Sequence, residues 1–172
     1  MHNANVMNRM LLVAAVAAAC LAPVAHAVEP GEAAPALSLP TAKGDPVALD
    51  KLRGKIVYVD FWASWCGPCR RSFPWMNEMQ ARYGPKGFTV VGVNVDKKRP
   101  DAERFLAQIP ATFTVVFDET GATPSAWGVK GMPSSYLVDG TGKVVYVERG
   151  FTDEHKADLE KRIAALVAAG KN

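Results

Sequence analysis

Cys66 and Cys69 are separated by Gly67 and Pro68, where an apolar segment gives way to a predicted helix. Backbone N–H groups at the start of a helix stabilise a nearby anion. We therefore expect Cys66 to gain thiolate character and to act as a nucleophile. Cys69 follows one turn later and is within reach to attack a mixed disulfide formed by Cys66. The spacing predicts dithiol–disulfide exchange.

Other uses of a cysteine pair are less well supported. A structural zinc site needs more ligands, and after residue 27 the chain offers no further cysteine and only His155. A purely structural disulfide would close a very small loop and so stabilise little. A Cu(I) site stays open, since two thiolates suit that ion. Met76 and Met79 lie in the same predicted helix, where methionines at this spacing are typical of core packing.

The predicted secondary structure alternates strands with helices. Runs rich in β-branched and aromatic residues predict strands at 56–62, 88–95, 114–117, 135–139 and 143–148. Helices are predicted at 66–83, 100–109 and 124–127, and after the capping residue Thr152. Two short apolar pieces, 37–39 and 47–49, predict an N-terminal hairpin. This order predicts an α/β fold with a mixed central β-sheet flanked by helices.

The N-terminal segment has the pattern of a secretory signal peptide. Arg9 is the only charged residue among the first 27, an apolar run follows it, and the segment ends in Ala25-His26-Ala27. We expect cleavage after Ala27, an exported, periplasmic protein, and one domain over 28–172. A lipoprotein anchored at Cys20 is the less favoured alternative, and a membrane anchor is disfavoured because the apolar run is short.

Composition sets further bounds on function. The chain has 172 residues, room for one domain, and its net charge is only +3, from 20 basic and 17 acidic residues. Neither a nucleic-acid partner nor an anionic membrane surface is indicated. We expect a monomer that needs no organic cofactor and no metal.

Asp60 lies in the apolar segment before the cysteines, flanked by Val59 and Phe61. A carboxyl group buried without a charged partner tends to stay protonated. Such a group could exchange a proton with Cys69 when that cysteine attacks the mixed disulfide. The alternative is a solvent-facing aspartate at a strand end.

The segment Trp65-Cys66-Gly67-Pro68-Cys69 resembles the active site of the thioredoxin superfamily. Asp60 and Pro74 match the buried aspartate and the helix-kinking proline of thioredoxin, and residues 127–133 (WGVKGMP) resemble the run that carries the cis-proline. This resemblance implies a thioredoxin fold in which Pro133 is cis and its loop lies against the cysteines. Peroxiredoxins place Thr or Ser three residues before the reactive cysteine, where this chain has Ala63.

By the same resemblance, substrate contacts are expected from Trp65, Met132 and Pro133. The backbone of the Pro133 loop could pair with an extended substrate segment, as an added strand would. Trp62 could also line the site, although either tryptophan could instead pack in the core.

Within the superfamily the chain is similar to exported TlpA/ResA-like thiol-disulfide oxidoreductases over residues 31–169. The similar features are the lead-in 31–35, the Arg53-Gly54-Lys55 turn, and extra length between Cys69 and Pro133. They imply an N-terminal β-hairpin extension and a central insertion. Many of that group carry glutamate where this chain has Ser72 and lack the acid at position 60, so this site is more thioredoxin-like.

The resemblance implies a protein-disulfide oxidoreductase, with the reductase direction favoured because Gly67-Pro68 adds no charge to stabilise the Cys66 thiolate. Expected partners are proteins with disulfides and a membrane thiol-electron transporter as electron donor. Cu(I) handling, cytochrome c maturation, and isomerase or oxidase activity are the alternatives.

Overall fold

A computed structural model describes residues 27–170. The strands are β1 (Ser38–Pro40), β2 (Pro46–Ala48), β3 (Ile56–Trp62), β4 (Phe88–Asn94), β5 (Thr114–Phe117), β6 (Ser134–Val138) and β7 (Val144–Arg149). The α-helices are α1 (Gly67–Tyr83), α2 (Arg99–Gln108), α3 (Ala122–Ala126) and α4 (Asp153–Ala169), and 3-10 turns occupy Leu49–Leu52 and Gly84–Lys86. The predicted alternation is confirmed, with most boundaries shifted by one or two residues.

The central sheet has five strands in the order β5-β4-β3-β6-β7. β3 pairs in parallel with β4 and antiparallel with β6, so the sheet is mixed, as expected. Every residue of β3 is buried, which explains its continuous apolar sequence. The thioredoxin fold expected from the sequence is confirmed.

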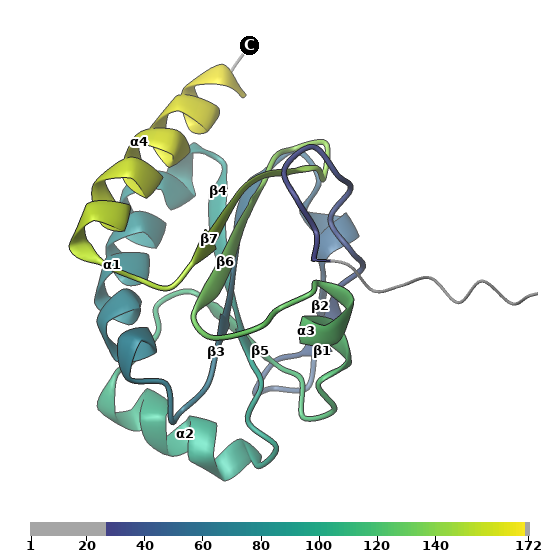
Figure 1. Cartoon of the computed structure of the whole chain (residues 1–172), viewed down its shortest axis with the longest axis vertical. Helices are drawn as coiled ribbons and strands as arrows, with labels where there is room; N and C mark the ends of the chain where they lie inside the picture. The colour runs from purple at the N-terminus through teal and green to yellow at the C-terminus, as the bar shows by residue number, and fades with distance from the viewer. Residues whose placement is uncertain (1–26, 171–172) are drawn as a thin grey trace, which may run out of the picture.

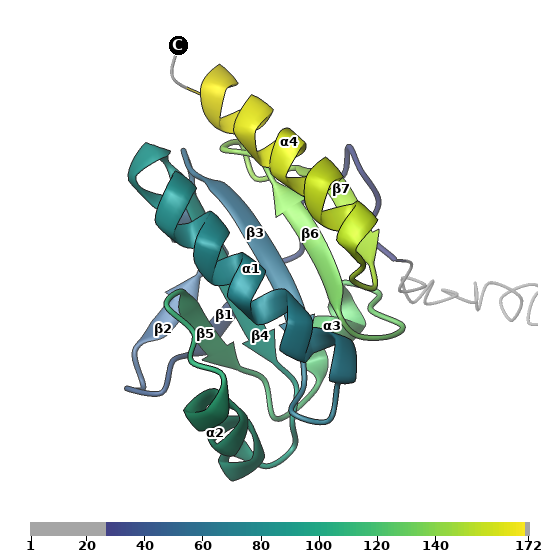
Figure 2. The same cartoon turned by 90° about the vertical axis from the view of Figure 1, so that its left-hand side faces the viewer.

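Two apolar layers sandwich the sheet. α1 and α4 cover one face, and α3 and the β1–β2 hairpin lie on the other (Figures 1 and 2). Alternate residues of β3 divide between the layers: Tyr58 and Trp62 pack under the helices, whereas Val59 and Phe61 pack on the opposite side. Asp60 therefore belongs, by alternation, to the face covered by α1 and α4.

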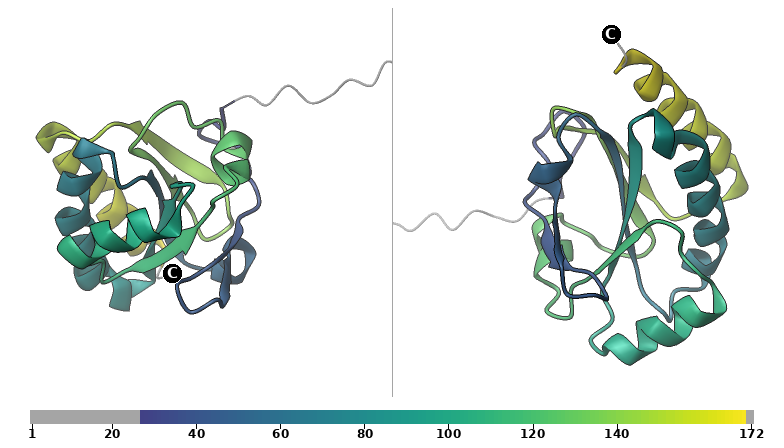
Figure 3. Two further views of the ribbon diagram at one scale, coloured as in Figure 1. Left: turned by 90° about the horizontal axis from the view of Figure 1, so that it is seen from below. Right: turned by 180° about the vertical axis from the view of Figure 1, so that it is seen from behind.

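The N-terminal hairpin and the central insertion are both present. β1 and β2 pair antiparallel in a separate two-stranded sheet. α2 and β5 occupy the extra length between Cys69 and Pro133, and β5 forms one edge of the main sheet. α2 lies beyond the end of the sheet, next to the beginning of α1 (Figure 3). The insertion thus adds a helix on the side of the molecule where α1 begins.

The N-terminal predictions fall largely outside the described residues. The signal peptide over 1–27, except for Ala27, and the alternative lipidation site Cys20 lie there. Val28 is buried in the layer opposite α1, and its N–H donates to the carbonyl of Trp127 at 3.4 Å. No helix within 27–170 is both long and apolar enough to span a membrane.

Candidate active site

The junction between β3 and α1 holds the two cysteines. Cys66 and Cys69 form a disulfide with an Sγ–Sγ distance of 2.05 Å. Cys66 is the N-cap of α1, and its Sγ accepts a hydrogen bond from the backbone N–H of Cys69 at 3.2 Å. Cys66 is 4% exposed and Cys69 is 0% exposed. A thiolate at Cys66 would meet the N-terminal N–H groups of the helix, which is the placement expected for a nucleophile.

A buried acid holds the loop that precedes Cys66. The carboxylate of Asp96 accepts hydrogen bonds from both the N–H and the hydroxyl of Ser64, each at 2.9 Å. It also accepts from the side-chain amide of Asn94 at 2.7 Å. Sequence reasoning missed this anchor. The available signal was a pair of polar residues, Asn94 and Asp96, at the end of an apolar strand.

Asp60 is 0% exposed, so the alternative of a solvent-facing aspartate is wrong. The hydroxyl of Ser135 donates to Oδ1 of Asp60 at 2.6 Å, while Oδ2 has no hydrogen-bond partner among residues 27–170. Burial raises the pKa of Asp60 from 3.8 to about 7, and the hydrogen bond from Ser135 opposes this shift. Asp60 can therefore exchange a proton near neutral pH. Ser135 was not anticipated, because only the pairing of β3 with β6 places it opposite Asp60.

Pro133 occupies the loop that leads into β6. The Met132–Pro133 peptide bond is cis, as expected. Ser134, the first residue of β6, pairs with Phe61 near the end of β3. The start of β6 thus meets the edge of the sheet where α1 begins, which brings the Pro133 loop to the cysteine end. The loop is held by a hydrogen bond from the Ser134 hydroxyl to the carbonyl of Gly131 at 2.7 Å.

The predicted substrate-contact residues differ in exposure. Trp65 is 70% exposed and lies next to Cys66, whereas Met132 is partly buried and Pro133 is buried. Trp62 is a core residue whose ring lies 4.9 Å from that of Phe73, so its alternative role in packing is the one observed. Trp65 is therefore the tryptophan available to a partner.

The side chains of Met76, Met79 and Ser72 have structural contacts within the protein. Met76 and Met79 are fully buried in the core layer beneath α1, in agreement with the packing interpretation. Ser72 is buried, and its hydroxyl donates to the carbonyl of Cys69 at 3.1 Å. Within residues 27–170, no group of three or more His, Cys, Asp or Glu side chains is arranged to hold a metal ion.

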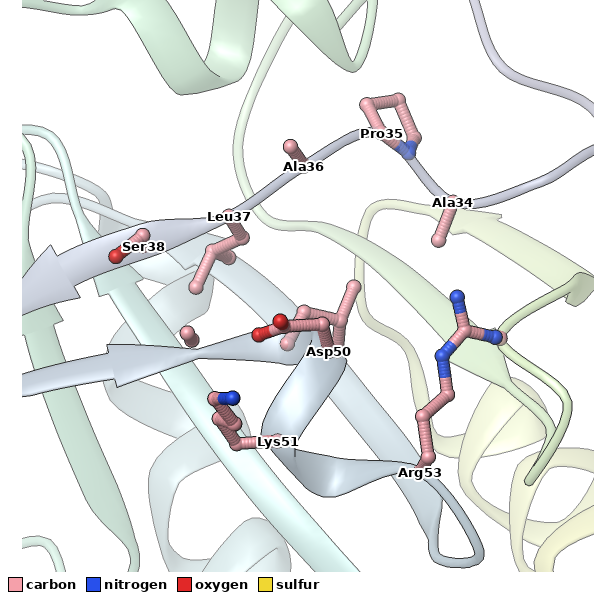
Figure 4. Close-up of a pocket in the computed structure, with 11 residues that line it drawn as sticks. Ala34, Pro35, Ala36, Leu37, Ser38, Asp50, Lys51 and Arg53 are labelled. Atoms are coloured by element: carbon pink, nitrogen blue, oxygen red, sulfur yellow. The ribbon is translucent and has the colours of Figure 1, made fainter.

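A separate pocket of about 460 Å³ lies between the segment that leads into β1 and the 3-10 turn that follows β2. Asp50, Lys51 and Arg53 surround it together with the chain from Ala34 to Ser38 (Figure 4). Neither cysteine lines this pocket, nor does Asp60 or Pro133. It is therefore distinct from the cysteine site.

Comparison with known families matches residues 29–163 to Redoxin. The chain belongs to the Redoxin family, within the thioredoxin superfamily. More particularly, it is a ResA/TlpA-like thiol-disulfide oxidoreductase with a Cys66–Cys69 pair.

Relatives and solved structures agree with that assignment. The thiol-disulfide oxidoreductase ResA of Geobacillus kaustophilus is 33% identical over 140 residues, which cover 81% of this chain and 79% of the relative. ResA of Bacillus subtilis is 31% identical, covering 75% of this chain and 72% of the relative. A crystal structure of a candidate thiol:disulfide interchange protein DsbE from Chlorobium tepidum is 54% identical, with a TM-score of 0.79, covering 82% of this chain and 99% of that one.

Proposed function

We propose that this chain is an exported, periplasmic reductase of protein disulfides. The observation that carries the proposal is the position of Cys66 at the N-cap of α1, with Cys69 one turn later and bonded to it. The proposed domain comprises residues 28–172, after removal of a signal peptide over 1–27.

Each site residue has a proposed role. The Cys66 thiolate attacks a substrate disulfide, forming a mixed disulfide and releasing one substrate thiolate. Cys69 then gives its proton to the carboxylate of Asp60 and attacks Sγ of Cys66. The mixed disulfide breaks, the second substrate thiolate leaves and takes a proton from water, and the Cys66–Cys69 disulfide remains. Two electrons have passed from the protein to the substrate.

Substrate contacts are assigned to Trp65, Met132 and Pro133. The exposure of Trp65 beside Cys66 supports its part in this assignment. A membrane thiol-electron transporter is the proposed donor that returns the pair to the dithiol, since the compartment itself is oxidising.

The test is reduction of insulin by the purified protein with dithiothreitol. We expect catalysis by the wild type, none by Cys66→Ser, and a trapped mixed disulfide with Cys69→Ser. Ser72→Ala, which leaves both thiols in place, is the matched control and should remain active. Failure of the wild type to accelerate insulin reduction, together with tight stoichiometric binding of Cu(I), would instead favour a copper-handling protein.

A further inference from the structure

Three polar side chains lie in register across neighbouring strands of the sheet. Asp60 on β3 is the pairing partner of Ser135 on β6, and Ser135 is the partner of Glu148 on β7. Directly opposed residues of antiparallel strands point to the same face of a sheet. All three are buried. Because Tyr58 and Trp62 alternate with Asp60 onto the same side of β3, the three residues lie on the face whose core layer includes residues of α1 and α4. A second carboxyl group therefore lies one strand beyond the hydrogen-bond partner of Asp60.

Glu148 is held in place by several neighbours. Its Oε2 accepts from the hydroxyl of Tyr146 at 2.9 Å, and its Oε1 accepts from the N–H of Arg149 at 3.0 Å. Nδ1 of His155, on α4, lies 3.3 Å from Oε1. Nδ1 itself is shielded from solvent, whereas the His155 side chain as a whole is 35% exposed. Glu148 thus contacts a partly exposed histidine on α4.

Tyr58 lies two residues before Asp60 on β3 and packs in the core layer on the same face of the sheet. Burial raises the pKa of Tyr58 well above its usual range, and the charges of Asp60 and Glu148 raise it further, while Ser135 lowers it. One buried hydroxyl is therefore influenced by both acids and by the serine between them. In a protein interior, where charges are weakly screened, two carboxylates disfavour each other's ionisation.

We propose that Glu148 is a positioning residue for Asp60, and that its charge, balanced by protonated His155, controls how readily Asp60 gives up its proton. The proposal rests on the role of Asp60 in the proposed function. When His155 is neutral, the negative charge of Glu148 favours protonated Asp60. When His155 is protonated, it offsets that charge and Asp60 ionises more easily. The site would thereby respond to a proton bound at a partly exposed side chain of α4.

Other titratable and charged groups face this row from neighbouring elements. They are Tyr58 on β3, Tyr146 on β7, Cys66 and Cys69 at the start of α1, and His155, Asp158 and Arg162 on α4. The two thiols do not titrate while they are joined as a disulfide. The oxidised protein is therefore the right material for measuring the coupling of Asp60 to Glu148.

The direct test follows the side-chain carboxyl carbon of Asp60 by NMR in oxidised protein labelled with 13C-aspartate, with Asp60→Asn to assign the resonance. In Glu148→Gln we expect the Asp60 titration midpoint to fall by about half a pH unit or more. His155→Gln should raise it. Glu148→Asp, which keeps the charge, should stay near the wild type, as should Glu154→Gln, which removes an exposed charge beside His155. An unchanged midpoint in folded Glu148→Gln overturns the inference.

A kinetic arm separates this inference from the proposed function. The rate at which Cys69 resolves a mixed disulfide is measured against pH for Glu148→Gln, with and without Asp60→Asn. We expect Glu148→Gln to shift the profile only when Asp60 is present, and the same shift in both backgrounds would contradict the inference. If the NMR midpoint moves but insulin is not reduced, the coupling stands and the reductase proposal fails. If insulin is reduced but the midpoint does not move, the reductase proposal stands and the coupling inference fails.

Discussion

Asp60→Asn should stabilise the oxidised protein at alkaline pH and have little effect in acid. Burial raises the pKa of Asp60 from 3.8 to about 7. At about 1.4 kcal/mol per pH unit, this difference corresponds to about 4 kcal/mol. Asparagine keeps the oxygen that accepts from Ser135 and puts a neutral group in place of Oδ2. The variant therefore removes the cost of a buried charge with little change in shape.

The sign follows from proton binding. A raised pKa means that the folded protein holds the Asp60 proton more tightly than the unfolded chain does. The wild type therefore loses stability as the pH rises from about 4 to about 7, the window between the two pKa values. Below this window Asp60 is protonated in both the folded and the unfolded protein. Above it, the folded protein carries the full cost of the buried Asp60 charge. The advantage of Asp60→Asn should grow across the same window and then level off.

Urea unfolding of both oxidised proteins between about pH 4 and about pH 8.5 measures this profile. Asp118→Asn is a control of opposite sign. Burial raises the pKa of Asp118, but hydrogen bonds from Thr120, Thr123 and Gly121 outweigh burial and lower it. Asp118→Asn should be less stable than the wild type at neutral pH, and the difference should become smaller in acid. A difference between Asp60→Asn and the wild type that is constant with pH, or a less stable variant at high pH, would refute the reasoning.

Four further predictions concern the cysteines, the loop and the N-terminus. In the reduced protein, iodoacetamide should alkylate Cys66 at least about tenfold faster than Cys69, and equal rates by mass spectrometry would contradict the assigned roles. Asp96→Ala should cost about 2–3 kcal/mol in urea unfolding, because it leaves the buried amide of Asn94 and the partly buried donors of Ser64 without their acceptor, and an unchanged stability would show that the loop needs no anchor. Equilibration with a redox buffer should give a potential nearer about −270 mV than about −120 mV, and a value above about −180 mV would favour an oxidase or isomerase. N-terminal sequencing of the exported protein should begin at Val28, and a lipid-modified cysteine as first residue would contradict the cleavage site.

The sequence was sufficient to predict the elements and the reactive pair because those features are local. The continuous apolar run of β3 predicted a strand buried on both faces, and it is one. Thr152 was expected to cap the last helix, and its hydroxyl accepts from the N–H of His155. The two cysteines, their Gly-Pro spacer and the helix start lie within a few residues of one another, so their spacing and their placement together predicted dithiol exchange.

The partners of Asp60 depended on the tertiary structure. Ser135 is 75 residues away and meets Asp60 only through the register of β3 with β6. The contact of Glu148 with His155 likewise requires α4 to pack across the end of β7. Periodicity tells which face of a strand a residue occupies, but not which residue of another strand will lie opposite it.

The exposure of the tryptophans near the cysteines also depended on the tertiary structure. Trp62 and Trp65 are both close to the cysteines in sequence, yet one is buried among aromatic rings and the other is exposed. The sequence by itself determined the fold class and the cysteine pair, because local hydrophobic pattern and residue spacing encode them. Only the tertiary structure decided which distant groups surround that pair, because strand register and helix packing are collective properties of the whole chain.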